Sequence, residues 1–149
     1  MYKTILVPLD GSKRAETILP QAANLAVCHQ AEVILFSVEE PELLLGIDEV
    51  VDVTSYRKER QHQRKKIESY LVSVQRELQK KDIKTKILIG QGPVVSTIIN
   101  IAEKEKADLI AMASHGLGGS ARTFYGSVDA GVLQRVDRPL LIVRSRRVE

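Results

Sequence analysis

A glycine-rich segment in the last third of the chain has residue types and spacing that suit a phosphate group. Five of the nine glycines lie between residues 116 and 131, and Gly126 is followed by Ser127, where a helical pattern begins. Glycine lets backbone amides approach a ligand closely, and the start of a helix offers free N–H donors and a partial positive charge. The segment therefore suits phosphate binding. A turn without any ligand accounts for the same glycines, so both interpretations stay open.

Asp10 is the second candidate for contact with a ligand. It directly follows an apolar run and is itself followed by Gly11 and Ser12. Its carboxylate could accept hydrogen bonds from a bound molecule. The competing interpretation is a turn in which Asp10 bonds to nearby backbone and caps the following helix. We favour the ligand contact.

The other chemically active side chains lack partners at useful spacing. No Cys or His stands at metal-ligand spacing from His115, which we expect to order its loop rather than to catalyse a reaction. Residues 57–66 hold six basic residues and one acid, which we interpret as a solvated helix face rather than a nucleic-acid patch. Cys28 is expected to be a small packed hydrophobe. Arg122 is a weaker candidate for phosphate contact.

Two familiar nucleotide-binding signatures are absent. The chain contains no G-x-x-x-x-G-K-[ST] motif. Gly90-Gln91-Gly92 continues to Pro93 without the final glycine of the dinucleotide fingerprint. A P-loop or Rossmann mechanism is therefore not expected.

Length and composition limit the class of protein. The 149 residues, 44% of them hydrophobic, predict one domain over 1–149 with its own core. Only 4% are aromatic, which argues against single-strand nucleic-acid stacking, and the net charge of +3 does not call for a nucleic-acid partner. A single Cys favours a reducing, cytoplasmic setting. We identify no secretion signal and no membrane-spanning run.

Strands and helices alternate along the chain. Strands are expected at 4–9, 32–38, 85–89, 107–113 and 139–144. Helices are expected after Ser12, as a possible N-cap, and over 55–80, 94–106 and 126–136. Continuous apolar strands are buried on both faces, so this order predicts an α/β fold with an open, doubly wound five-stranded parallel sheet and helices on both faces.

Details within the helices sharpen these expectations. Pro20 should bend the first helix or postpone its regular start. The long helix should bury a stripe that consists of Ile67, Leu71, Val74 and Leu78. The last helix should bury Val128, Val132 and Leu133. Residues 40–54 have no clean period and are expected to form an excursion after the second strand. Ligands of such sheets bind beyond the carboxyl ends of the strands, which places Asp10 and the glycine-rich segment at one edge.

Three separated blocks of the sequence resemble the universal stress protein family. Its ATP-binding members carry G-x2-G-x9-G-[ST], and the segment from Ala113 to Ser127 has that spacing with Ala113 in place of the first glycine. Residues 107–112, Ala-Asp-Leu-Ile-Ala-Met, directly precede this motif and belong to the same block. The other two blocks are 5–12, Ile-Leu-Val-Pro-Leu-Asp-Gly-Ser, and 137–143, Asp-Arg-Pro-Leu-Leu-Ile-Val. The resemblance extends from end to end of the chain.

The resemblance implies a strand order of 3-2-1-4-5 and an adenine-nucleotide site between strands 1 and 4. The positions that match the family around adenine and ribose are Pro8, Leu9, Asp10, Val38 and Met112. The positions that match it around the phosphates are Ala113, His115, Gly116, Gly119, Gly126, Ser127 and Val128. The implied ligand is ATP, or AMP or ADP, with Mg²⁺ or Mn²⁺ and with Asp10 as a weak route to the metal ion.

The resemblance also implies how the protein works. It suggests a nucleotide-dependent stress-response or sensor protein that forms a homodimer through the last strand, Leu140 to Val143. The chain has no Walker lysine, general base or arginine-finger arrangement, so at most slow ATP hydrolysis is expected. The alternative is a dimeric interaction module of the same fold that binds no nucleotide.

Overall fold

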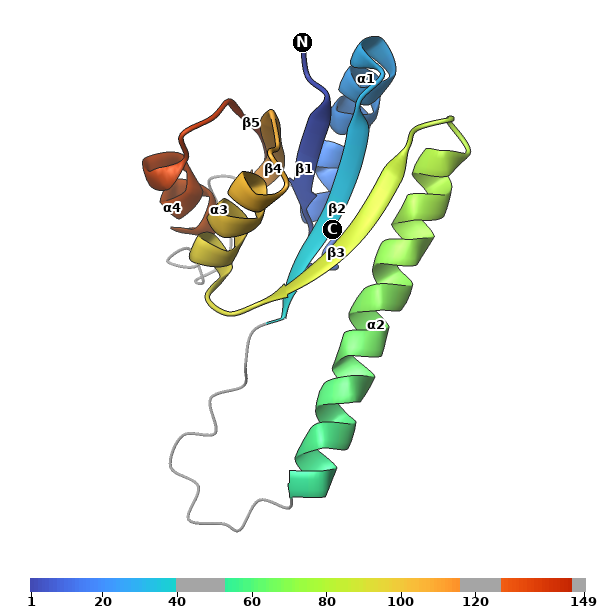
Figure 1. Cartoon of the computed structure of the whole chain (residues 1–149), viewed down its shortest axis with the longest axis vertical. Helices are drawn as coiled ribbons and strands as arrows, with labels where there is room; N and C mark the ends of the chain where they lie inside the picture. The colour runs from blue at the N-terminus through green and yellow to red at the C-terminus, as the bar shows by residue number, and fades with distance from the viewer. Residues whose placement is uncertain (40–52, 116–126, 146–149) are drawn as a thin grey trace.

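Five parallel strands form the centre of the molecule, and helices cover both faces of the sheet (Figure 1). The computed structural model describes residues 1–39, 53–115 and 127–145. Its elements are β1 (Thr4–Pro8), the 3₁₀ helix η1 (Ala15–Ile18), α1 (Leu19–His29), β2 (Glu32–Glu39), α2 (Val53–Gln79), β3 (Thr85–Gln91), α3 (Val94–Lys104), β4 (Leu109–His115), α4 (Ser127–Arg135) and β5 (Leu140–Ser145). The strand order is β3-β2-β1-β4-β5, which confirms the fold class and the order expected from the resemblance.

The core consists of two layers, one on each face of the sheet. Ile5 and Val7 of β1 pack with residues of η1, α1 and α2, whereas Leu6 packs with residues of α3 and α4. All three side chains are fully buried. Successive side chains of a strand point to opposite faces, so a strand that is apolar at every position belongs between two layers of helices.

Pro20 postpones the first α-helix, as predicted. The chain after β1 first forms the 3₁₀ helix η1, and α1 begins at Leu19 with Pro20 in its first turn. Ser12 acts on the 3₁₀ helix rather than on α1, because its Oγ accepts a hydrogen bond from the N–H of Ala15 at 3.1 Å. Proline is tolerated there because the first turn of a helix needs no N–H donor.

Two predictions of buried side chains are wrong. Leu133 was expected on the buried side of α4, but it is 60% exposed, whereas Val132 is fully buried. Cys28 was expected to pack in the core, but it is exposed. In both helices the buried row is narrow: Cys28 lies about 200° around α1 from the buried Ala26, and Leu133 about 100° around α4 from Val132.

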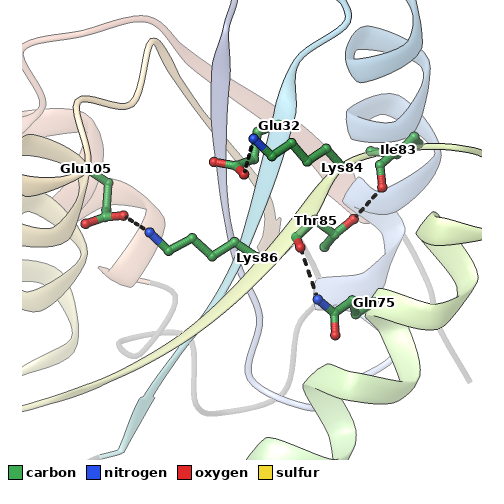
Figure 2. A network of polar contacts seen from close by, with 7 residues as sticks. All are labelled: Glu32, Gln75, Ile83, Lys84, Thr85, Lys86 and Glu105. Carbon is green, nitrogen blue, oxygen red and sulfur yellow. Dashed lines mark hydrogen bonds and ion pairs between the residues drawn. The ribbon is translucent and has the colours of Figure 1, made fainter.

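Polar contacts fasten the amino end of β3 to three neighbouring elements (Figure 2). Gln75 of α2 donates through Nε2 to the carbonyl oxygen of Thr85 at 3.0 Å. Lys86 Nζ lies 2.6 Å from Oε1 of Glu105, which stands just beyond α3. The neighbouring Lys84 forms an ion pair with Glu32 of β2. These contacts lie at the opposite end of the sheet from the candidate site. They therefore stabilise the sheet that carries the site and are not part of the site.

Candidate functional site

Successive strands are added on one side of β1 and on the opposite side of β4, so the strand order reverses between these two strands. The carboxyl ends of β1 and β4 are therefore the candidate site. From β1 the chain continues to β2 on one side, and from β4 it continues to β5 on the other. The two strands are in direct register, with Ile5 opposite Leu109 and Leu6 opposite Ile110. Connections that leave in opposite directions open a crevice at the carboxyl ends of such strands.

Three of the predicted adenine-side residues lie in the neighbouring strands β1, β2 and β4. Pro8 ends β1 opposite Phe36 of β2, and Val38 is the next-to-last residue of β2. Met112 is the middle residue of β4, two positions beyond Ile110, which pairs with Leu6 of β1. Val38 and Met112 belong to the core layer that faces α3 and α4, and so does Val128 of α4. These three apolar side chains therefore share one face of the sheet.

Leu9 and Ala113 belong to the opposite layer, which faces α1 and α2. The side chain of Leu9 is 4% exposed. Its N–H donates to the carbonyl oxygen of Phe36 at 2.8 Å, and its own carbonyl oxygen accepts the buried Ser37 hydroxyl at 2.7 Å. Leu9 thus ties the end of β1 to β2. Sequence reasoning missed Ser37, because it stands within an apolar run.

Asp10 forms the turn that was the competing interpretation. Its Oδ1 accepts hydrogen bonds from the Ser12 N–H at 2.9 Å and from the Ser12 hydroxyl at 2.6 Å. The residue is exposed, and within the described residues no hydrogen bond uses Oδ2. One oxygen therefore holds the turn, and the other makes no hydrogen bond with the described residues, in an exposed residue just after β1. The two interpretations of Asp10 are compatible.

The predicted phosphate side lies largely outside the described residues. Gly116, Gly119 and Gly126 fall in the undescribed segment, and their role stays a prediction. His115 is the last residue of β4, and Ser127 is the first residue of α4. The chain therefore leaves the central sheet at His115 and enters a helix at Ser127, and the remaining residues of the motif between them lie outside the described residues.

A hydrogen-bonded pair beside Asp10 escaped the sequence analysis. Tyr70 of α2 donates from its hydroxyl to Glu16 Oε2 at 2.8 Å. Burial raises the pKa of Tyr70 well above its usual range, and the hydrogen bond to Glu16 and the negative charges of Glu16 and Asp10 raise it further. Helical spacing placed Tyr70 beside the buried stripe of α2, but nothing in the sequence pointed to Glu16.

A Tyr70→Phe variant should be less stable than the wild type at neutral pH, and the difference should be small at high pH. The neutral phenol is favoured in the folded state, so its stabilising effect is complete below about pH 10, the ordinary tyrosine pKa, and is lost as pH rises towards the higher folded-state pKa. We expect the variant to be less stable by about 0.5–1.5 kcal/mol at pH 8, and the difference to shrink at pH 11. Urea unfolding at both pH values measures it. A difference that grows with pH would contradict this account of Tyr70.

Other features of the described residues can be stated briefly. Among residues 1–39, 53–115 and 127–145, no three His, Cys, Asp or Glu side chains are placed to hold a metal ion. Across the same ranges, no helix is both long and apolar enough to cross a membrane. The basic run of α2 is solvated at Arg57, Lys58, Lys65 and Lys66, as predicted.

Comparison with known proteins agrees with the fold. A model of the universal stress protein family matches residues 1–144. Universal stress protein MJ0577 of Methanocaldococcus jannaschii is 31% identical over 157 aligned positions, which cover 98% of this chain and 97% of that protein. Its solved structure matches with a TM-score of 0.80 at 28% identity and covers 99% of both chains.

Two further solved structures share the fold and contain nucleotides. A universal stress protein in complex with cAMP matches with a TM-score of 0.72 at 22% identity, over 97% of this chain and 98% of that one. A universal stress protein from Archaeoglobus fulgidus in complex with dAMP matches with a TM-score of 0.62 at 22% identity, over 95% and 97% of the two chains.

Proposed function

The chain belongs to the universal stress protein family, and from that premise we propose that it binds an adenine nucleotide at the carboxyl ends of β1 and β4. The proposed ligand is ATP, AMP or ADP, with Mg²⁺ or Mn²⁺ on the phosphates. The observation that carries the proposal is the shared face of Val38, Met112 and Val128 at the point where strand order reverses. The related proteins solved with cAMP and dAMP support the choice of adenine.

The proposed site divides the nucleotide between two kinds of surface. Aliphatic side chains on the α3 and α4 face would contact the base, because the chain has few aromatic residues for stacking. Asp10 Oδ2 would accept a hydrogen bond from a ribose hydroxyl. The free amides that begin α4 at Ser127, together with the glycines before them, would hold the phosphates.

We propose a sensor role in a stress response rather than fast catalysis. Phosphoryl transfer needs positioned cations and a group that activates the nucleophile. The sequence has no Walker lysine motif for the first, and it contains no arrangement that marks a general base or an arginine finger. The protein would therefore report nucleotide occupancy to a partner in the cytoplasm, with at most slow hydrolysis.

An Asp10→Asn variant tests this function without removing the turn. Asparagine keeps an oxygen that can accept the two Ser12 hydrogen bonds, but it puts a donor where Oδ2 would accept from ribose. We expect the dissociation constant for ATP to rise about 10- to 100-fold, the effect of losing a hydrogen bond to a charged group, and the melting temperature to stay within about 2 °C. Titration calorimetry and thermal unfolding measure the two quantities.

Asp10→Ala is the matched comparison. It loses the turn as well, so it should weaken ATP binding to a similar extent and also lower the melting temperature. If Asp10→Asn binds ATP as tightly as the wild type, Asp10 does not contact the ribose, and its role is limited to forming the turn.

The edge strand β5 supports a proposal for self-association. Among the described strands, β5 pairs with β4 alone, so its other edge carries unpaired N–H and C=O groups. Leu133 of the preceding helix is 60% exposed. We propose a homodimer through Leu140 to Val143, which would pair this edge with its copy. The same dimer serves the alternative function, an interaction module without nucleotide, which a failure of ATP binding would favour.

A further inference from the structure

A buried carboxylate stands at the carboxyl end of β2, next to a residue that would face the base. Glu39 is the last residue of β2, and its side chain is 4% exposed. Val38, one position earlier, belongs to the layer that faces α3 and α4. Carboxylates are seldom fully buried unless an opposite charge compensates them. Glu39 does not stand out in the sequence, because its ionic partners are far away along the chain.

Two arginines of α2 supply the compensating charge. Arg60 Nε lies 3.4 Å from Glu39 Oε1, and Arg64 Nη1 lies 3.5 Å from Glu39 Oε2. Residues four apart lie on the same side of a helix, so both guanidinium groups reach Glu39 from one face of α2. Their side chains are 40% and 47% exposed, so the pairs close over the buried carboxylate from the solvent side. Within the described residues Oε2 accepts no hydrogen bond, so Arg64 is its compensating group.

The backbone of the same residue joins β2 to the segment after β3. Glu39 stands opposite Gln91 in the parallel register, and its carbonyl oxygen accepts the Gly92 N–H at 3.4 Å. Two positions earlier, Ser37 is fastened to Leu9 at the end of β1. Val38 is therefore held between one residue that is tied to β1 and another that is tied to α2 and to the segment after β3.

We propose that Glu39 is a positioning residue for the adenine end of the nucleotide site, acting through its ion pairs with Arg60 and Arg64. The inference rests on the proposed function, since it concerns that same site. Without the negative charge, the two guanidinium groups on adjacent turns repel each other, and the end of β2 loosens from α2. Val38 then shifts relative to Met112 on the face that would hold the base.

Glu39→Gln tests the proposal, with Glu32→Gln as its matched control. The two variants make the same chemical change on the same strand, and Glu32 forms an ion pair with Lys84 at the opposite end of the sheet. Titrations of the full chain use ATP and AMP. We expect Glu39→Gln to raise both dissociation constants by the same factor, about tenfold, because the base end and not the phosphates is disturbed. Glu32→Gln should leave both within about twofold of the wild type.

A second variant and a ligand-free measurement cover the case in which Glu39→Gln folds poorly. Arg64 is exposed enough to tolerate Arg64→Gln, which should weaken ATP and AMP binding in the same equal way. Hydrogen exchange of the Gly92 amide, which donates to the Glu39 carbonyl oxygen, should be faster in both variants than in the wild type.

The possible outcomes separate this inference from the function beneath it. A wild type that binds neither nucleotide overturns the proposed function, and the role of Glu39 falls with it. If the wild type binds both nucleotides and Glu39→Gln binds them with unchanged affinity, only the positioning role of Glu39 is overturned. A loss of affinity for ATP without an equal loss for AMP would also overturn it, because Glu39 would then act on the phosphates.

Discussion

Gly126→Val is expected to weaken ATP binding by at least about 100-fold while the fold stays intact, which corresponds to about 2.7 kcal/mol or more of binding free energy. Gly126 immediately precedes Ser127, the first residue of α4. The free amides at the start of that helix are the proposed donors to phosphate, and they must approach it closely. Valine adds a branched side chain at the point of approach. Titration calorimetry measures the loss, and circular dichroism checks the fold.

Ala130→Val is the matched control for this variant. Ala130 is exposed in the same helix, four residues after Gly126, so the substitution adds a valine to α4 beyond the proposed point of approach of the phosphates. We expect it to bind ATP as the wild type does. If Gly126→Val also binds ATP with wild-type affinity, the phosphates are not held at the start of α4.

Phe36→Ala is expected to lower the free energy of unfolding by about 3–5 kcal/mol, the range for truncating a buried phenylalanine. Phe36 is fully buried in β2, between β1 and β3, within the layer that faces α3 and α4. A Cβ atom at Gly90 of β3 would lie 2.7 Å from its Cζ, so the ring is packed tightly against the neighbouring strand. At about 2–4 °C per kcal/mol for this chain length, the melting temperature should fall by about 6–20 °C.

Two further variants make the packing argument sharper. Phe36→Leu keeps most of the volume and should be destabilising by less than about 1.5 kcal/mol. Gly90→Ala should destabilise the wild type, because its methyl group would collide with Phe36 and Thr97, and should destabilise the Phe36→Ala background less. Equal effects of Gly90→Ala in both backgrounds would show that the ring does not fill this space.

The sequence predicted the fold well because its strongest patterns are those of a parallel sheet. Apolar runs such as 32–38 marked strands buried on both faces, and Pro20 marked the delayed start of α1. The predictions for Leu133 and Cys28 failed because the buried rows of short helices are narrow. A small error in helical phase therefore turns an exposed residue into a predicted core residue.

The site was harder to predict than the fold. The family motif placed Leu9 and Val38 at the same edge, but motif matching does not assign them to opposite faces of the sheet. The alternation along β1, from Leu6 through Val7 onward, was the available signal for the face of Leu9. The partners of Glu39 lie 21 and 25 positions away on α2, and only the packing of α2 on the sheet brings them together.

The most direct test of the account is a calorimetric titration of the full-length protein with ATP in the presence of Mg²⁺. The protein is first stripped of any resident small molecule, and mass spectrometry of the released material checks for an adenine nucleotide. We predict saturable binding of one nucleotide per chain, with ATP preferred over GTP because aliphatic side chains and the end of β2 shape the base site. No binding at millimolar ATP would contradict the account.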